Sequence, residues 1–276
     1  SKHIVMRILI VALFLLTLSS NGQTKESILE EGLLLYKSEK ASWHGTDLFL
    51  EKHPEKRNKI KGYFSYPDNG MQHCVFYDGS ENPKILAIVS FDSDFKLSEA
   101  VIDTTSRKFT SKELDYYDIR NKTMNLINKD TLFKQYNNTG TNPIPIITKK
   151  EKKVYVLTGP KVNGVVVFGN DYLVTFNEKN EIVGRKKLHN NIIPIYYNKE
   201  EKAKVTMHTH NGLTGELITP TDICTLMLYG GYTQWKTHMV ISEKYNSIWD
   251  IKKKDLTVIT KEAWEKISKF SNKKNK

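Results

Sequence analysis

The sequence predicts an α+β fold, and three observations point to it. In the first half, short runs with strand-like alternation are separated by turn-forming segments such as residues 67–70. In the second half, similar runs are interspersed with segments that carry helix-start signals. The composition, with 39% hydrophobic and 26% charged residues, is that of a globular chain and not of a disordered one. A length of 276 residues allows one or two domains.

The chain begins with a segment that is typical of a secretory signal peptide. Arg7 precedes an unbroken apolar run at residues 8–16, and mainly small and polar residues follow up to Gln23. The run is too short for a permanent transmembrane helix, although an N-terminal membrane anchor is the alternative interpretation. We therefore expect residues 1–23 to be a signal peptide, and the protein to be secreted or periplasmic. Loss of Lys2 and Arg7 with this segment lowers the formal charge from +11 to +9.

Residues 24–150 are expected to form an N-terminal α+β domain of unknown function. Ser27 followed by Glu30 is a capping-box start, which predicts a short amphipathic helix at 27–36. Further helices are predicted at 46–51 and 129–136, and strands at 62–66, 73–77, 85–91 and 99–104. The segment 137–153 contains turn formers, two prolines and a basic run, so we expect a domain boundary or a long connection there.

Residues 151–276 are expected to form the second domain, in which strands again alternate with helices. Helices are predicted at 221–229 and 261–270, and strands at 154–157, 164–168, 172–176, 182–189, 192–197, 204–210, 237–242 and 247–252. No internal repeat is visible. The mixture supports the α+β class for this half as well.

Two histidines and an aspartate form the strongest chemical pattern in the sequence. His208 and His210 lie two residues apart in a predicted strand, so both imidazoles point to the same face. Asp222 follows twelve residues later in a helix start, with Thr219 as the N-cap and Pro220 at the first helical position. Two imidazoles and one carboxylate are typical ligands of a catalytic zinc ion. Taken alone, Asp222 and Thr219 are equally well explained as helix-capping residues.

This pattern resembles the motif of the JAMM (JAB/MPN) zinc metallopeptidases. That motif reads His-x-His-Pro, seven residues, Ser, two residues, Asp; here the chain reads His208-Thr209-His210-Asn211, seven residues, Thr219, two residues, Asp222. The strand at 237–242 and the Tyr-Asn-Ser-Ile run after it are similar to the RadC branch of the family. The resemblance covers about residues 155–255 and implies a mixed sheet with helices, as in the JAMM and cytidine-deaminase folds, in a secreted bacterial protein.

The resemblance implies specific roles for the matching residues. His208, His210 and Asp222 would bind Zn²⁺, and Thr219 would stand for the serine that donates a hydrogen bond to the developing oxyanion. The zinc-activated water would cleave an amide or isopeptide bond of a peptide or protein substrate. An upstream glutamate acts as the general base in the family, but Lys161 lies near that position here. Asp171 is the best acidic substitute, whereas Glu178 and Glu181 are expected to be turn residues.

The leading prediction is therefore a secreted zinc-dependent hydrolase. Because the upstream glutamate is missing, a non-catalytic binding module with the same fold is the alternative. His189 could lie near the metal, but an ordinary half-exposed strand histidine is the simpler interpretation. His238 is expected to be structural. Cys74 and Cys224 exclude a four-cysteine zinc site and are expected to be buried free thiols.

The basic charge does not indicate a nucleic-acid partner. The lysines are spread along the chain, and neither an arginine-rich helix nor an aromatic RNA-binding signature is present. We therefore expect no nucleic acid as a partner. A lysine-rich surface fits solvation or attraction to anionic envelope material.

Overall fold

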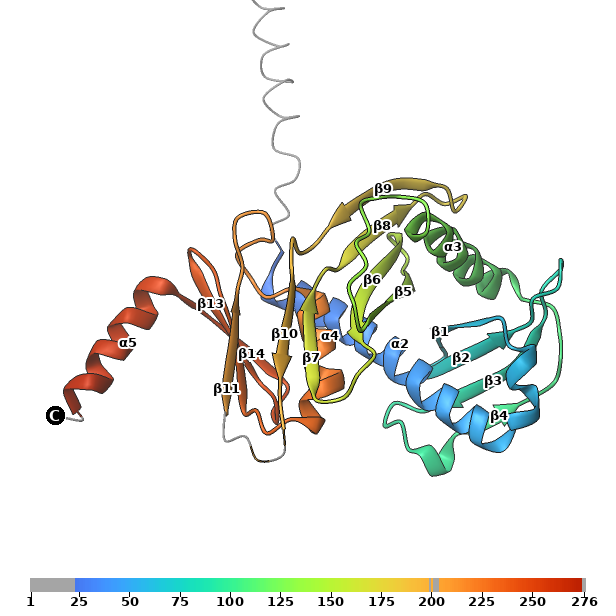
Figure 1. Cartoon of the computed structure of the whole chain (residues 1–276), viewed down its shortest axis with the longest axis horizontal. Coiled ribbons are helices and arrows are strands. Elements are labelled where there is room, and N and C mark those ends of the chain that lie inside the picture. Colours follow the sequence, from blue (N-terminus) through green and yellow to red (C-terminus); the bar gives the residue numbers. More distant parts are fainter. Residues whose placement is uncertain (1–22, 199, 201–203, 275–276) are drawn as a thin grey trace, which may run out of the picture.

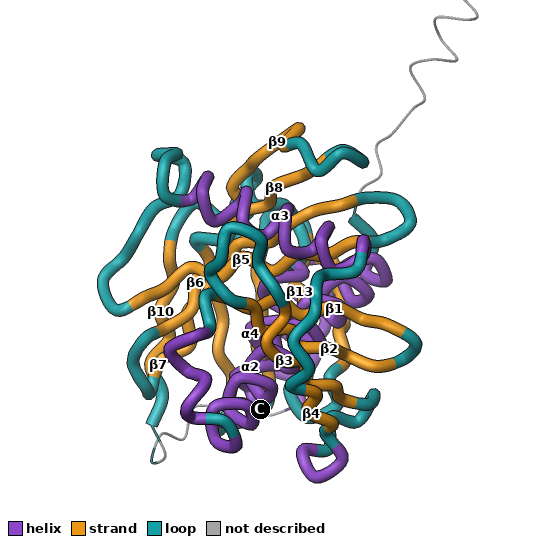
Figure 2. Tube along the Cα trace, turned by 90° about the vertical axis from the view of Figure 1, so that its right-hand side faces the viewer, coloured by secondary structure: helices purple, strands orange, loops and turns teal. Residues whose placement is uncertain are grey.

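The computed structural model describes residues 23–198, 200 and 204–274 and confirms the α+β class (Figure 1). The predicted signal segment, except Gln23, lies outside the described residues. The described residues form three four-stranded sheets and one two-stranded sheet. The sheets are arranged around two helices, α2 (Lys25–Lys52) and α4 (Pro220–Tyr229), which lie side by side in both views (Figures 1 and 2). None of the helices within the described residues is long and apolar enough to cross a membrane.

The first element is one long helix, α2 (Lys25–Lys52), and not the two short helices predicted at 27–36 and 46–51. Its N-cap is Thr24, and Ser27 is the third residue of that capping box. The middle of the buried face consists of small residues such as Ser38, Ala41 and Gly45. This face has no continuous apolar stripe, so the hydrophobic pattern is interrupted although the helix is not.

Small residues on α2 allow other elements to come close to it. A Cβ at Gly32 would lie 2.7 Å from Cβ of Ile223 on α4 (Pro220–Tyr229), and one at Gly45 would lie 2.6 Å from Cβ of Cys74. Helix α2 also contributes Ile28, Leu35 and Phe49 to three different hydrophobic clusters. It therefore connects the predicted N-terminal domain to the element that carries Asp222.

The first sheet has the strand order β1-β2-β3-β4 and is antiparallel throughout. Its strands agree closely with the four predicted ones: β1 (Gly62–Asp68), β2 (Met71–Tyr77), β3 (Ile85–Phe91) and β4 (Val101–Asp103). Short 3-10 helices, η1 (Pro54–Lys59) and η2 (Leu97–Glu99), lie in the connections. Cys74 on β2 and Cys224 on α4 are both buried free thiols, as predicted.

Helix α3 (Ser111–Ile127) replaces the helix predicted at 129–136, which is a turn region. Thr110 and Glu113 form the capping box that starts it. Its buried face includes the polar side chains of Glu113, Arg120 and Thr123. These buried polar groups remove the apolar periodicity on which the sequence prediction depends.

The long connection predicted at 137–153 is not present as such. Residues 139–147 instead form the strand β5 (Thr139–Ile147). It pairs with β6 (Lys152–Pro160) at the edge of a sheet with the order β5-β6-β8-β9, where β8 is Tyr172–Phe176 and β9 is Ile182–Lys187. Pro143 and Pro145 both lie on this edge strand. Proline is tolerated there because the missing N–H can face away from the neighbouring strand. The predicted 172–189 hairpin is confirmed as β8 and β9.

The last part of the chain surrounds α4 with two sheets. β7 (Val165–Gly169) pairs with β10 (Ile192–Tyr196), and the remaining strands form a mixed sheet with the order β11-β12-β13-β14. The bounds are β11 (Val205–Thr209), β12 (Thr237–Ile241), β13 (Tyr245–Asp250) and β14 (Asp255–Thr260). β11 and β12 are parallel, with α4 and η3 (Gly230–Tyr232) between them in the chain. Strand β14 was not predicted, and α5 (Lys261–Lys274) projects from this end (Figure 1).

Candidate metal centre

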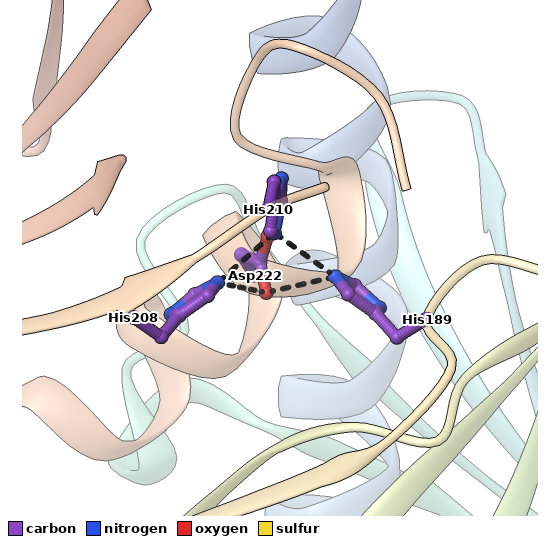
Figure 3. Close-up of side chains that lie close together, drawn as sticks. All are labelled: His189, His208, His210 and Asp222. Atoms are coloured by element: carbon purple, nitrogen blue, oxygen red, sulfur yellow. Dashed lines mark hydrogen bonds and ion pairs between the residues drawn. The ribbon is translucent and has the colours of Figure 1, made fainter. Parts of the chain in front are cut away.

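Four buried side chains from three parts of the chain converge in this last region (Figure 3). His208 lies in β11, His210 directly follows that strand, Asp222 is in the first turn of α4, and His189 lies between β9 and β10. One donor atom from each residue lies within 4.8 Å of the others, and each residue is at most 5% exposed. We call these four residues the four-donor cluster.

The strand geometry predicted for the two histidines is confirmed. His208 is paired with Val240 of β12, and the backbone N–H of His210 donates to the carbonyl of Ile241 at 2.9 Å. The pairing therefore continues to His210, and alternation along the strand brings both imidazoles to the same side. Their Nε2 atoms lie 3.0 Å apart.

The helix cap determines which oxygen of Asp222 faces the histidines. Oδ2 accepts hydrogen bonds from the backbone N–H of Thr219 at 3.0 Å and from its hydroxyl at 2.7 Å. Oδ1 has no hydrogen-bond partner among the described residues and lies 3.6 Å from Nε2 of both His189 and His208. An unpaired oxygen of a buried carboxylate is costly, and a cation bound beside it would remove this cost.

Several distances within the four-donor cluster are close to those of a tetrahedral ligand set. Nε2 of His210 lies 3.2 Å from Nε2 of His189, and 3.4 Å from Oδ2 of Asp222. A regular tetrahedron with metal–ligand bonds of roughly 2.0–2.1 Å has edges of about 3.3–3.4 Å. The donor–donor separations between these side chains range from 3.0 to 3.6 Å and thus lie on both sides of that value. The spacing is therefore compatible with a metal ion held by all four side chains.

Each histidine has a polar neighbour at its other ring nitrogen. Nδ1 of His210 lies 2.9 Å from the carbonyl oxygen of Leu217, which can only accept, so Nδ1 donates. Nδ1 of His189 faces Oδ2 of Asp171 at 3.5 Å. In His210 this arrangement leaves the lone pair of Nε2 directed at the cluster, whereas Nδ1 of His189 has only this charge contact and no hydrogen-bond partner among the described residues. Such outer contacts are typical of metal-bound histidines.

His238 holds the third histidine in the same way. Its Nε2 lies 2.9 Å from Nδ1 of His208, and its Nδ1 lies 2.8 Å from the hydroxyl of Thr206. The fully buried ring also stacks on Phe168 with 4.7 Å between ring centroids. Burial lowers the pKa of His238 to about 3, so it is neutral and can accept from Nδ1–H of His208. The structural role predicted for His238 is thus orientation of His208.

The electrostatics of the cluster favour a positive charge at its centre. Burial would raise the pKa of Asp222, but the neighbouring histidines, His189 first, hold it well below its usual range. Burial likewise lowers the pKa of His189, yet the carboxylates of Asp222 and Asp171 outweigh this effect and raise it to about 10. Burial lowers the pKa of His208 to about 4. Without a metal ion, the positive charge is a proton on His189.

His189 is the residue whose role the sequence analysis underestimated, because it is buried and belongs to the cluster. The β7–β8 turn holds its loop in place. Leu188 donates to the carbonyl of Asp171, Asn170 donates to the carbonyl of Asn191, and a Cβ at Gly169 would lie 2.2 Å from that same oxygen. Gly169 and Asn170 both have positive φ. These are tertiary contacts, and no spacing rule connects His189 to His208.

The other residues predicted for the site lie around the cluster. Asp171 is buried beside His189, and its Oδ1 accepts from the backbone N–H of Thr158 at 3.0 Å. Thr219 directs its hydroxyl hydrogen to Asp222. Glu178 and Glu181 are exposed turn residues, as predicted. The chain thus combines three predicted ligands with a fourth, His189.

The sequence matches no family model, no curated protein and no solved structure. The chemistry of the site therefore has to be derived from the four-donor cluster itself. Three imidazoles and one carboxylate, all buried, can hold a transition-metal ion.

Proposed function

We propose that this protein binds one zinc ion in the four-donor cluster and that the ion has a structural role in a non-catalytic binding module. The observation that carries the proposal is the convergence of four buried donors within 4.8 Å of one another, with Oδ1 of Asp222 lacking a hydrogen-bond partner among the described residues. Imidazole and carboxylate ligands in this arrangement favour Zn²⁺.

The number of protein ligands supports a structural role. Catalytic zinc sites have three protein ligands and an open position, whereas structural sites have four. In the JAMM-like pattern, His208, His210 and Asp222 would leave such a position open. Nε2 of His189 lies at the fourth corner, 3.6 Å from Oδ1 of Asp222 and 3.2 Å from Nε2 of His210. We infer that His189 closes the site.

Metal analysis of the purified protein tests this proposal. We expect about one zinc ion per chain, and the Co²⁺-substituted protein should show the intense visible absorption of a tetrahedral site. His208→Ala should abolish binding. His53→Ala, which changes a histidine outside the cluster, is the control. Full retention of metal by His208→Ala would refute the proposal.

The second candidate is a zinc-dependent hydrolase that cleaves an amide or isopeptide bond. When bound, Zn²⁺ would polarise a carbonyl and lower the pKa of a water molecule. His189 would have to leave the metal, and with Asp171 3.5 Å from its Nδ1 it could then accept a proton. The buried carboxylate of Asp171 beside His189 is the observation that favours this alternative.

Peptide and isopeptide hydrolysis assays separate the two candidates. A closed structural site predicts no turnover by the zinc-loaded wild type. Zinc-dependent turnover that is lost in both His208→Ala and His189→Ala, but not in His53→Ala, would establish the hydrolase instead.

We also propose that the protein is exported, because residues 1–23 have the pattern of a signal peptide. Expression of the full chain should place the protein in the periplasmic fraction or the medium. A chain that lacks residues 1–23 should stay in the cytoplasm, and equal distribution of the two forms would contradict export.

A further inference from the structure

A cavity of about 380 Å³ lies between α2, α4 and the β5–β6 pair, outside the four-donor cluster. We propose that it binds an organic cation, an alkylammonium or guanidinium group. The inference does not depend on the metal, because the two sites share no residue.

The cavity contains a buried carboxylate that lacks a direct ion pair. Glu39 on α2 is 6% exposed, and its Oε2 accepts from the side-chain amide of Asn142 at 2.6 Å. Arg120 acts on Glu39 through its charge, but its guanidinium lies over the ring of Tyr63, 4.9 Å from the centroid. Among the described residues, no cation pairs with Glu39 directly. Burial raises the pKa of Glu39 to about 7, and a bound cation would favour its ionised form.

Aromatic side chains line the same cavity. Trp43 and Tyr229 meet edge to face with 5.4 Å between ring centroids, and Tyr63 is the third ring. Aromatic faces attract ammonium and guanidinium groups through the ring quadrupole. A carboxylate next to several rings therefore matches an organic cation in both charge and shape.

The same groups disfavour other classes of ligand. An anion would face the carboxylate of Glu39. A divalent metal ion needs several oxygen ligands, and within the described part of the chain Glu39 is the only carboxylate that lines the cavity. The exposed Lys161 also lines it, so a ligand with a second positive charge would be repelled there. A monocation with a neutral or anionic remainder fits best.

The cavity is adjacent to the outer shell of the metal centre. Thr158 lines it, and the backbone N–H of Thr158 donates to Asp171, which faces His189. Thr225 on α4, three residues after Asp222, lines it as well. The proposed ligand would thus lie on the side of Asp171 that faces away from His189, close to the contact between α2 and α4.

Binding of simple monocations tests the proposal. n-Butylammonium and n-butylguanidinium chloride are titrated into the full chain at pH 8, and 1-butanol serves as the neutral analogue. The indole N–H signal of Trp43, assigned with Trp43→Phe, should shift in the wild type with at least one of the cations and not with 1-butanol. Glu39→Gln should weaken cation binding by about tenfold or more, whereas Glu30→Gln, an exposed change on the same helix, should leave it unchanged.

Several outcomes would overturn the proposal. They are equal shifts with 1-butanol, equal weakening by Glu30→Gln, or no shift of the Trp43 signal at saturating concentrations of both cations. The wild-type titration alone decides the question if Glu39→Gln does not fold.

Discussion

At the scale of single residues, the proposed metal centre depends on the second contact of each of its four donor residues. Thr219 occupies one oxygen of Asp222, Leu217 accepts from His210, and His238 holds His208. The longest of these contacts is the one between Asp171 and His189, at 3.5 Å. His189 is therefore the ligand whose orientation is most sensitive to its partner.

Replacing Asp171 with asparagine should weaken zinc binding without removing a ligand. The amide oxygen can still accept from His189, but the negative charge that makes the imidazole more basic is lost. We expect the affinity to fall by about 10- to 100-fold. Competition with a chelator measures the change, and Asp94→Asn, an exposed substitution, should have no effect. An unchanged affinity would mean that Asp171 does not orient His189.

Zinc affinity should rise with pH. The pKa of His189 is raised to about 10 without metal, so near neutral pH the ion must displace one proton from it. His208 and His238, with pKa values of about 4 and 3, are already neutral. We therefore expect about a tenfold gain per pH unit between roughly pH 6 and 8. Calorimetry in buffers of different ionisation enthalpy should show release of about one proton, and a flat profile would contradict this assignment.

At the scale of elements, α2 and α4 pack closely because Gly32 has no side chain at their contact. Gly32 of α2 lies against Ile223 of α4, the residue that follows Asp222. Helix α2 begins 195 residues before α4 in the chain, but the two helices are neighbours in space, as Figure 2 shows. The position of the helix that carries Asp222 thus depends on α2.

Gly32→Ala tests this helix contact. The new Cβ would lie 2.7 Å from Cβ of Ile223, so α2 and α4 would have to separate. We expect a loss of about 1–3 kcal/mol in the free energy of unfolding, together with weaker zinc binding. Denaturant unfolding measures the loss. Gly231→Ala, where a Cβ would meet nothing within 4 Å, is the matched control.

Glu113 connects α3 to its surroundings and should make the stability sensitive to acid. It caps the helix through Thr110, pairs with Arg107 and accepts from Tyr66. Burial would raise its pKa, but these contacts, Arg107 first, lower it to about 2. Its stabilisation is therefore complete above about pH 4.5 and is lost as the pH falls toward 2, by roughly 1–3 kcal/mol. Unfolding curves of wild type and Glu113→Gln should converge at low pH; a constant difference would contradict this.

At the scale of the whole molecule, the four-donor cluster connects three segments that lie far apart in the chain, so metal binding should stabilise the fold. With zinc at about 100- to 1,000-fold above its Kd, binding adds about 3–4 kcal/mol. For a chain of this size that corresponds to a rise in Tm of about 5–15 °C. A chelator should remove this increment and added zinc should restore it. In His208→Ala, the Tm should respond to neither.

The sequence by itself determined the features that depend on neighbouring residues. His208 and His210 share a face because strand side chains alternate. Thr219 and Asp222 form the capping box of α4 because they lie three residues apart, within one helical turn. The strands β1 to β3 and the β8–β9 hairpin follow from the same short-range rules. The α+β class follows in turn from the succession of these local elements.

Only the tertiary structure decided the features that depend on distant residues. α2 continues through 37–45 because other elements pack against its small residues, and β5 keeps two prolines because it lies at a sheet edge. His189 becomes the fourth donor because the β7–β8 turn holds its loop next to β11. Side chains brought together by packing leave no fixed spacing in the sequence, and a local pattern therefore shows three members of the four-donor cluster but not His189.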